Sequence, residues 1–270
     1  MSKIQWTDIT QNPITVATGG HWCRKISAGC ANCYAETINT GARFSFASGL
    51  KYSGPAPDLK FDHEMVAKWS RMRSPKRIFV GSMTDVFGDW VPREWQFRIF
   101  DAAKYAPMQT IQLLTKRPDV ALVAAREWCE SVGKDTLPPN VWMGCTMEDQ
   151  ASADARIDAL ISIPAAVRFI SAEPLLSKIL LPYKKLEQVQ WVIVGGESGP
   201  GARPCELFHL KEILGRCINT GTPAFVKQLG SRPTNNGYPI LRVRGKGGTP
   251  EDLERFRVNI REFPTANTEP

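Results

Sequence analysis

Three cysteines lie within eleven residues near the start of the chain: Cys23, Cys30 and Cys33, in the run C-R-K-I-S-A-G-C-A-N-C. Cysteine thiolates hold iron–sulfur clusters, and three of them can bind three corners of a [4Fe–4S] cube. The fourth iron then has no protein ligand and is open to a substrate or cofactor. The spacing therefore favours a cluster that takes part in chemistry over one that only stores electrons.

The three thiols could also serve in ways that need no iron. Zinc binding is one, because His21 stands two residues before Cys23 and could supply a fourth ligand. Zinc sites usually come as two separated ligand pairs, however, and no second C-x-x-C or H-x-x-x-H follows in the sequence. A disulfide, or ordinary buried thiols, would account for the cysteines as well. The remaining cysteines occur singly in segments typical of a core: Cys129, Cys145, Cys205 and Cys217.

The composition indicates one globular chain with a basic surface. It has 270 residues, 43% of them hydrophobic, enough to bury a full core. No apolar run reaches membrane-spanning length and the start M-S-K-I-Q-W lacks the apolar stretch of a signal peptide, so we expect a cytoplasmic protein without a membrane partner. Seven cysteines, an odd number, suit a compartment that keeps thiols reduced. The net charge of +7 suits a nucleic acid as partner, and equally a merely basic protein.

Short apolar runs alternate with helical patterns along the chain. Strands that are apolar throughout are buried on both faces, which is typical of a parallel sheet built from βα units. Six such units and an earlier strand before the cysteines predict an α/β fold, a partial or complete parallel (β/α) barrel, with a doubly wound open sheet as the competing fold. The predicted strands are 77–81, 110–114, 140–145, 167–171, 190–195 and 223–227, and the predicted helices between them include 92–105, 118–131, 151–161 and 206–219.

We predict two parts, a barrel over residues 1–230 and a C-terminal extension over residues 231–270. Beyond residue 230 the composition changes to Arg, Asn, Gly and Pro, which makes a poor core. We expect the extension to cover one end of the barrel or to contact a ligand. Within the first part, residues 53–62 are predicted to form a loop and residues 62–72 a helix.

Polar residues follow the predicted strands at their C-terminal ends, in S-M-T-D (82–85), T-K-R-P (115–118), T-M-E-D (146–149), S-A-E-P (171–174), G-E-S-G (196–199) and K-Q (227–228). In a parallel barrel these ends share one rim. Helix capping is sufficient to explain Ser82 or Thr146 alone. Carboxylates and lysines after successive strands predict a functional rim, with one cavity shared by the cysteine loop and Asp85, Lys116, Glu148, Glu173, Glu197 and Lys227.

The run G-G-E-S-G-P-G-A-R (195–203) is the richest of these strand ends. Its glycines would let the backbone approach a ligand closely, and Arg203 could clamp a carboxylate or phosphate. The run is not a dinucleotide fingerprint, because the G-x-G-x-x-G register is absent.

The chain resembles a phage-associated, radical-SAM-like three-cysteine family and, more remotely, enzymes of the spore photoproduct lyase type. The likeness covers roughly residues 3–230. It is carried by W-T-D, N-P, C-R-K-I-S-A-G-C-A-N-C-Y-A, G-S-M-T-D-V-F, L-L-T-K-R-P, N-V-W-M-G-C-T, F-I-S-A-E-P-L-L, W-V-I-V-G-G-E-S-G-P-G-A-R-P and F-V-K-Q-L-G. Here six residues separate the first two cysteines, where the common radical SAM spacing has three, which indicates a longer cluster loop.

The resemblance implies a radical SAM barrel with two cofactors, a [4Fe–4S] cluster held by Cys23, Cys30 and Cys33, and S-adenosylmethionine (SAM) on the open iron. Tyr34 would stack on adenine or pack on the barrel, Asp85 would take the SAM amino group, and Thr115 or Lys116 the ribose or carboxylate. The full set of expected cofactor-binding residues is Tyr34, Ser82, Asp85, Thr115, Lys116, Glu148, Gly195, Gly196 and Ser198, and the expected catalytic residues are Glu173, Glu197 and Lys227.

The resemblance also suggests a substrate. Phage association and positive charge favour DNA, and we expect a radical reaction on a modified thymine base or its side chain, presented flipped out or single-stranded. The expected partners are DNA and an electron donor such as flavodoxin or ferredoxin, for a monomer in the host cytoplasm. The expected DNA-contacting cations are Lys116, Arg117, Arg203, Lys227, Arg232, Arg242, Arg244 and Lys246. Two competing functions are a radical enzyme acting on a small molecule or peptide, and a non-catalytic iron–sulfur or zinc module that binds nucleic acid.

Overall fold

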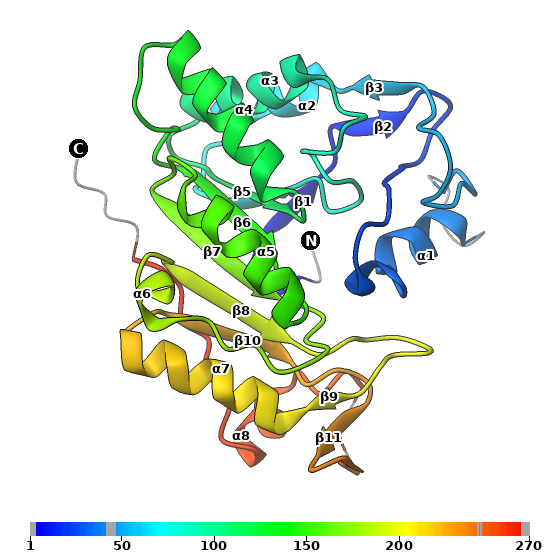
Figure 1. Cartoon of the computed structure of the whole chain (residues 1–270). Helices are drawn as coiled ribbons and strands as arrows, with labels where there is room; N and C mark the ends of the chain where they lie inside the picture. Colours follow the sequence, from blue (N-terminus) through cyan, green and yellow to red (C-terminus); the bar gives the residue numbers. More distant parts are fainter. Residues whose placement is uncertain (1–3, 42–46, 242, 244, 266–270) are drawn as a thin grey trace. The chain divides into compact units, whose positions relative to one another are not determined.

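A computed structural model describes residues 4–41, 47–241, 243 and 245–265 (Figure 1). Among them, seven strands form one sheet in the order β1-β4-β5-β6-β7-β8-β10, with parallel pairing. The order follows the chain and never reverses, as in a partial (β/α) barrel and unlike a doubly wound sheet. The predicted fold class is confirmed. The strands are β1 (Ile9–Gln11), β4 (Arg77–Val80), β5 (Thr110–Thr115), β6 (Val141–Thr146), β7 (Val167–Ala172), β8 (Trp191–Gly195) and β10 (Ala224–Gln228).

The chain divides into two compact units. Among the described residues, the first comprises those up to Gly144 with Ser162–Ala166, and the second comprises Cys145–Ile161 with those from Val167 onward. The predicted boundary between residues 230 and 231 stays a prediction.

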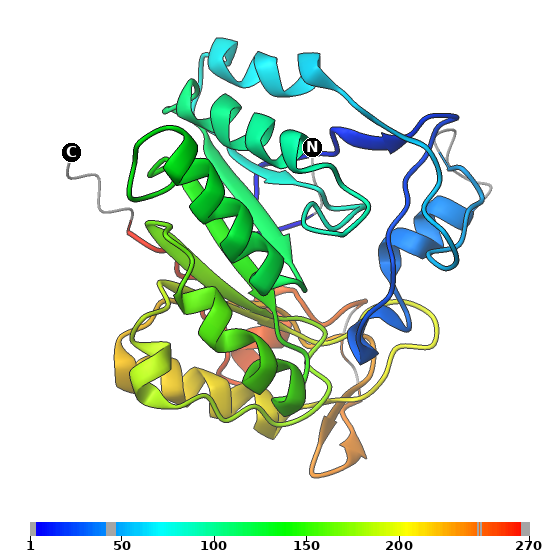
Figure 2. The same cartoon turned by 45° about the horizontal axis from the view of Figure 1, so that its top comes forward.

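The first unit contains the cysteine segment and the first parallel strands. Ile78 of β4 lies between Ile9 of β1 and Ile111 of β5, and the strand interiors are buried on both faces, as parallel pairing requires. Helices α3 (Arg93–Lys104) and α4 (Pro118–Ser131) lie side by side (Figures 1 and 2). The smaller elements are β2 (Ile14–Val16), α1 (Tyr34–Thr40), β3 (Leu59–Phe61) and α2 (His63–Ala67), which a 3₁₀ turn at Lys68–Arg71 continues.

The second unit contains the later strands and their helices. β8 pairs in parallel with β7 and with β10, and its five residues are buried, as in a central strand. The helix α7 (Leu207–Thr220) ends at Gly221, whose φ of 69° is the left-handed conformation that glycine adopts freely at such ends. The other elements are α5 (Gln150–Ile161), α6 (Tyr183–Leu186), β9 (Cys205–Glu206), β11 (Pro233–Asn235), β12 (Tyr238–Pro239) and α8 (Pro250–Arg255).

The sequence-based expectation of a poor core beyond residue 230 is wrong. Leu253 and Val258 are fully buried. A segment beyond α8 also pairs with the β10 backbone, because the N–H of Val226 donates to the carbonyl of Ile260 and the N–H of Glu262 donates to the carbonyl of Ala224. A few well-spaced apolar residues are therefore enough to fix a segment whose average composition is polar.

The segment before β4 differs from its sequence-based prediction in one part and agrees with it in another. Part of the predicted loop 53–62 forms β3, which pairs antiparallel with β2, whereas the helix predicted for residues 62–72 is present as α2 and its 3₁₀ continuation.

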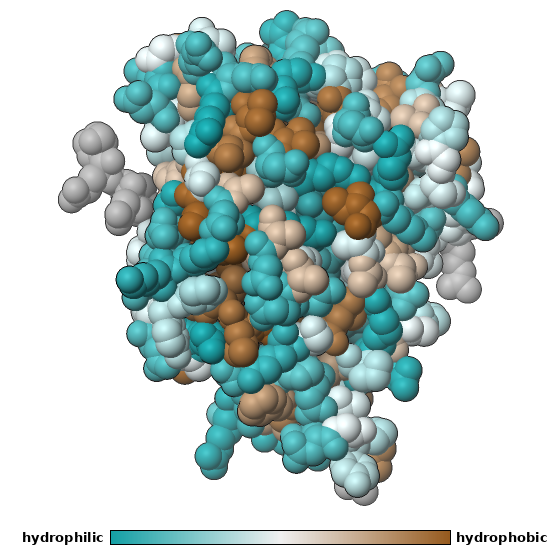
Figure 3. Space-filling view, viewed as in Figure 1, coloured by the Kyte–Doolittle hydropathy of each residue, from teal (hydrophilic) through white to brown (hydrophobic). Residues whose placement is uncertain are grey.

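None of the helices in the described part of the chain has the length and apolar character needed to cross a membrane. On the face drawn in Figure 3, hydrophobic residues form small groups among hydrophilic ones, which is normal for a protein surface.

We predict that Leu253→Ala lowers the free energy of unfolding by about 2–5 kcal/mol, because it leaves a cavity in a buried site. Urea denaturation followed by circular dichroism measures the change. Leu241→Ala is the matched control, since that side chain is 73% exposed and its loss should cost less than about 0.5 kcal/mol. Equal effects of the two substitutions would contradict the buried placement of α8.

Candidate functional site

The three cysteines lie in a loop that is anchored to its surroundings. Cys30 ends a short 3₁₀ turn, and Cys33 directly precedes α1. Cys23 and Cys33 pack against one small apolar cluster, and Cys33 interacts electrostatically with both other thiols. All three are free and partly exposed. The structure therefore brings the predicted ligands together at one place in the first unit.

The residues after Cys23 hold the loop through ion pairs. Arg24 contacts the carboxylate of Asp89 at 2.8 Å, and Lys25 contacts Glu36 of α1 at 2.5 Å. Glu36 also accepts a hydrogen bond of 2.8 Å from the N–H of Tyr52. The long C-x6-C segment is therefore fastened at its first two residues.

The metal-free thiols of Cys23 and Cys33 are neutral. Burial raises the pKa of Cys23 to about 12, with the charge of Asp85 acting in the same direction, and burial also raises the pKa of Cys33. A protonated thiol is a weak nucleophile, so this environment does not suit covalent catalysis by Cys23. A bound metal displaces such protons, and the donor set suits a metal better than a reaction of the bare thiols.

The donor set fits a cube, in which each thiolate binds a different iron. Within the described ranges, no group of three or more His, Cys, Asp or Glu side chains is arranged to hold one metal ion. His21, the candidate fourth ligand of a zinc site, is buried, and its Nδ1 lies 3.2 Å from the carbonyl oxygen of Ile14. Burial lowers the pKa of His21, which keeps its imidazole neutral.

Two tyrosine hydroxyls hold the segment after β4, one from Tyr34, next to Cys33, and one from Tyr52, in the apolar cluster beside the cysteines. Tyr34 donates to the carbonyl of Ser82 at 2.7 Å, and Tyr52 donates to the carbonyl of Met83 at 2.8 Å. The hydroxyl of Thr84 donates to the carbonyl of Trp22, next to Cys23. The Tyr34 ring is still 51% exposed, so stacking on a ligand stays a prediction, and the hydroxyl has a structural role of its own.

The carboxylate of Asp85 accepts four hydrogen bonds, three of them from residues at the end of β5. Its Oδ1 accepts from the hydroxyl of Thr115 at 2.7 Å and from the N–H of Phe87 at 3.0 Å. Its Oδ2 accepts from the N–H of Lys116 at 3.1 Å and from Arg117 at 2.9 Å. Three predicted cofactor-binding residues are thus neighbours in the first unit. Their contacts to SAM stay predictions, and the carboxylate already serves four protein donors.

Glu173 and Lys227, two of the three predicted catalytic residues, are paired in the second unit. Lys227 Nζ lies 3.1 Å from Glu173 Oε1, and the Ser171 hydroxyl lies 3.4 Å from Glu173 Oε2. Gly195 leaves room for this pair, because a Cβ on Gly195 would lie 2.9 Å from Glu173 Oε1. The arrangement can hold a proton between an amine and a carboxylate, both partly exposed.

Glu197, the third predicted catalytic residue, binds Arg203 in a fork of two hydrogen bonds, 2.6 and 3.0 Å long. It also accepts from the backbone N–H of Arg203 at 2.8 Å. The glycine next to it, Gly196, packs so closely on the backbone of Leu229 that a Cβ would collide with it. Gly196 therefore makes room for the protein's own backbone, and its predicted contact with a cofactor stays a prediction.

Glu148 is fully buried, and its carboxylate contacts Arg156 at 2.6 Å, which also donates to the carbonyl of Thr146. Removing either partner would leave an uncompensated buried charge, so the pair has a structural role of its own. Its predicted contact to a cofactor would require this pair to open. Ser198 follows Glu197 at a partly exposed position.

The cations expected to contact DNA differ in their surroundings. Arg117, Arg203 and Lys227 are paired with carboxylates, Lys116 is half-buried, and Arg232 and Lys246 are exposed. The predicted contacts at Arg242 and Arg244 fall outside the described residues. The pairing of Arg156 with Glu148 and of Arg117 with Asp85 could not be predicted, because a sequence shows a cation but not the carboxylate with which it pairs.

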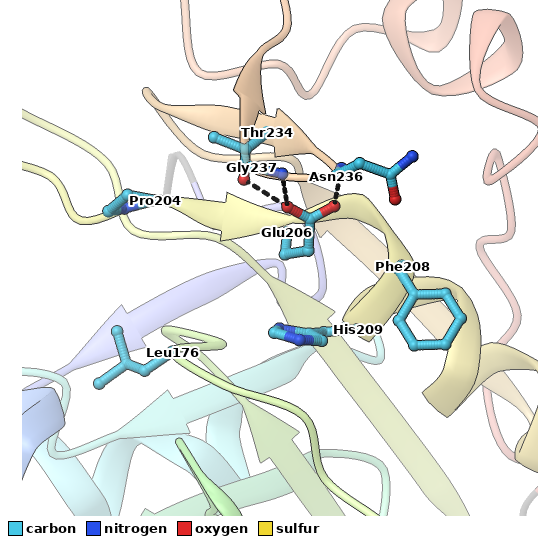
Figure 4. A pocket seen from close by; sticks show the side chains of 8 residues that line it. All are labelled: Leu176, Pro204, Glu206, Phe208, His209, Thr234, Asn236 and Gly237. Carbon is cyan, nitrogen blue, oxygen red and sulfur yellow. Dashed lines mark hydrogen bonds between the residues drawn. The ribbon is translucent and has the colours of Figure 1, made fainter.

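A pocket of about 510 Å³ lies beside α7 in the second unit (Figure 4). Glu206, at its edge, accepts from Thr234 Oγ1 at 3.0 Å and from the N–H groups of Asn236 at 2.8 Å and Gly237 at 3.0 Å. These bonds fasten the turn between β11 and β12, which needs positive φ at Asn236 and Gly237. The lining residues are Leu176, Pro204, Glu206, Phe208, His209, Thr234, Asn236 and Gly237.

Comparison with known proteins places the chain in a family. The sequence pattern of a family described as "Protein of unknown function (DUF5131)" matches residues 1–257. The chain belongs to the DUF5131 family. No curated protein and no solved structure matches it. The DUF5131 match includes the cysteine loop, all predicted rim residues and α8, so the family pattern extends past the predicted barrel boundary at residue 230.

We predict that Glu206→Gln destabilises this DUF5131 protein in a pH-dependent way. Burial alone would raise the pKa of Glu206, but the hydrogen bonds from Gly237, Asn236 and Thr234 lower it below the ordinary 4.5. A lowered carboxyl pKa stabilises the fold above pH 4.5, and the effect disappears as the pH falls through the folded-state pKa. We expect a loss of about 1 kcal/mol at pH 7.

Urea denaturation of the wild type and of Glu206→Gln at several pH values measures this difference. Glu254→Gln, on an exposed side chain of α8, is the control and should leave stability unchanged at each pH. A difference at pH 7 that persists undiminished at pH 3 would show that the charge of Glu206 is not involved.

Proposed function

We propose that the protein is a radical SAM enzyme that binds a [4Fe–4S] cluster through Cys23, Cys30 and Cys33. The observation that carries the proposal is the closeness of three partly exposed thiols that form no disulfide: Cys23 and Cys33 pack against one apolar cluster, and Cys33 interacts electrostatically with Cys23 and with Cys30. The resemblance of the motifs to the radical SAM family supports it, as does the parallel, sequentially ordered sheet. When bound and reduced, such a cluster supplies the electron that cleaves SAM into methionine and a 5′-deoxyadenosyl radical.

The chain's own residues would hold and shield the cofactors. The three cysteines would bind iron, and the exposed ring of Tyr34 would offer a surface for adenine. Lys116 and Thr115, placed beside the cysteine loop by Asp85, would lie near the ribose or carboxylate of SAM. In the second unit, the Glu173–Lys227 pair would exchange a proton with the substrate. Either Glu173 Oε1 or Lys227 Nζ would take up or give that proton.

The proposed substrate is a modified thymine base, or its side chain, in phage DNA. The net charge of +7 and the exposed Arg232 and Lys246 support a polyanionic partner. A base in a duplex would have to leave the stack before a radical could reach it. An external one-electron donor such as flavodoxin or ferredoxin would supply the electron.

Anaerobic reconstitution tests the cofactor. We predict about four irons and four sulfides per chain, with 5′-deoxyadenosine formed from SAM after reduction. Replacing Cys23, Cys30 or Cys33 by Ala should abolish both. Cys129→Ala and Cys217→Ala are the controls, because these thiols are buried in α4 and α7. Stoichiometric zinc after purification without oxygen, with no cluster uptake, would refute the proposal.

Salt dependence tests the DNA partner. We predict that affinity for DNA falls with salt by about 0.9 log units per contacted phosphate for each tenfold increase. Arg232→Ala and Lys246→Ala should each reduce this slope, whereas Lys104→Ala, at the end of α3 in the other unit, should leave it unchanged. Absence of DNA binding at low salt, together with cleavage of SAM, would indicate a small molecule or peptide as substrate.

A further inference from the structure

Arg117 joins the end of β5 to the cysteine loop. One terminal nitrogen of its guanidinium lies 2.9 Å from Asp85 Oδ2, and the other donates to the carbonyl of Arg24 at 3.2 Å. The guanidinium also lies over the Trp90 ring, 4.7 Å from its centroid. Its side chain is only 13% exposed. A planar cation held from three directions has little freedom, so it fixes the distance between its partners.

The contact with Arg24 reaches the first cysteine ligand. Arg24 follows Cys23 directly, and its carbonyl oxygen, which accepts from Arg117, lies 3.9 Å from the Cys23 sulfur. The Arg24 side chain packs over the rings of Trp22 and Trp90, 5.5 Å from each centroid. The backbone that carries Cys23 is therefore held from the side of β5 through Arg117.

Asp85 supplies the opposite charge at the same place. Its side chain is 9% exposed, so solvent screens the pair weakly. Arg117 donates to the carbonyl of Arg24, the residue after Cys23, so both members of the pair lie close to that cysteine. The pair thus places one positive and one negative charge beside Cys23, while the two side chains hold each other in place.

We propose that Arg117 and Asp85 are positioning residues that hold Cys23 in place for cluster binding and set the charge beside it. This rests on the proposed function. Reduction adds an electron to the cluster, so a fixed cation nearby stabilises the reduced state and a fixed anion opposes it. Arg117 therefore raises the reduction potential of the cluster, and Asp85 lowers it.

The first experiment is a redox titration of the anaerobically reconstituted full chain, followed by electron paramagnetic resonance in the absence of SAM. Arg117→Gln should shift the potential downward, Asp85→Asn should shift it upward, and the double variant should lie between the two. If the pair were merely structural, both single variants would shift the potential in the same direction or not at all, and either result would overturn the charge assignment.

The matched control is the pair of Asp8 and Arg77. It is another Asp–Arg pair of the first unit, 3.1 Å long, at the start of β4 rather than beyond its end. Asp8→Asn and Arg77→Gln should leave the potential unchanged, although both remove a comparable ion pair. A shift as large as that of the Asp85 and Arg117 variants would show that any change of fold stability moves the potential, and would refute the assignment.

The second experiment needs no cluster. In hydrogen exchange of the metal-free chain, the peptide covering residues 23–33 should exchange about fivefold faster in Arg117→Gln, the change expected for one lost hydrogen bond. Arg117→Lys keeps the positive charge. It should also accelerate exchange, but it should shift the reduction potential of the cluster less than Arg117→Gln does. Unchanged exchange in both variants would overturn the positioning role. If the wild type takes up no cluster, the proposed function is overturned, and so is the effect of Arg117 and Asp85 on the reduction potential. The hydrogen-exchange result would still decide whether Arg117 positions the cysteine loop.

Discussion

Parallel strand pairing is the constraint on which the rest of the structure depends. Because neighbouring strands run in the same direction, the residues that follow them emerge at the same edge of the sheet. Pairing of β4 with β5 therefore brings Asp85 beside Thr115, Lys116 and Arg117, although thirty residues separate Asp85 from Thr115. Pairing of β8 with β7 and β10 does the same for Glu173, Gly195 and Lys227 in the second unit.

The polar groups at these strand ends are neutralised in pairs. Four carboxylates expected at the rim each meet a cation: Asp85 with Arg117, Glu148 with Arg156, Glu173 with Lys227, and Glu197 with Arg203. Charges taken out of water are costly unless such partners compensate them. The pairs contribute no net charge, so the +7 of the chain comes from its other residues. Charge at the strand ends positions side chains, whereas exposed charge elsewhere is available to a polyanion.

The sequence predicted the main strands and helices well, because each buried strand is a short apolar run and each helix has an apolar stripe. It missed β3, β9, β11 and β12, which are two or three residues long and show no periodicity. The closeness of the three cysteines could be predicted from their spacing, and their role as cluster ligands stays a prediction. The role of Arg117 could not, because in sequence it is one of several basic residues, and only the fold shows its contacts with Asp85, Arg24 and Trp90. The close packing of Gly196 on the backbone of Leu229 is likewise visible only in the fold.

The segment that pairs with β10 has a consequence for association between molecules. β10 is an outer strand of the sheet, and an outer strand offers unpaired N–H and C=O groups to any other extended chain. Here the backbone of Ile260 and Glu262 takes up groups of Val226 and Ala224, and Arg261 forms an antiparallel bridge with Phe225. This short stretch covers the outer edge of the sheet. A chain shortened before residue 258 would therefore be prone to edge-to-edge aggregation, even if its barrel strands still folded.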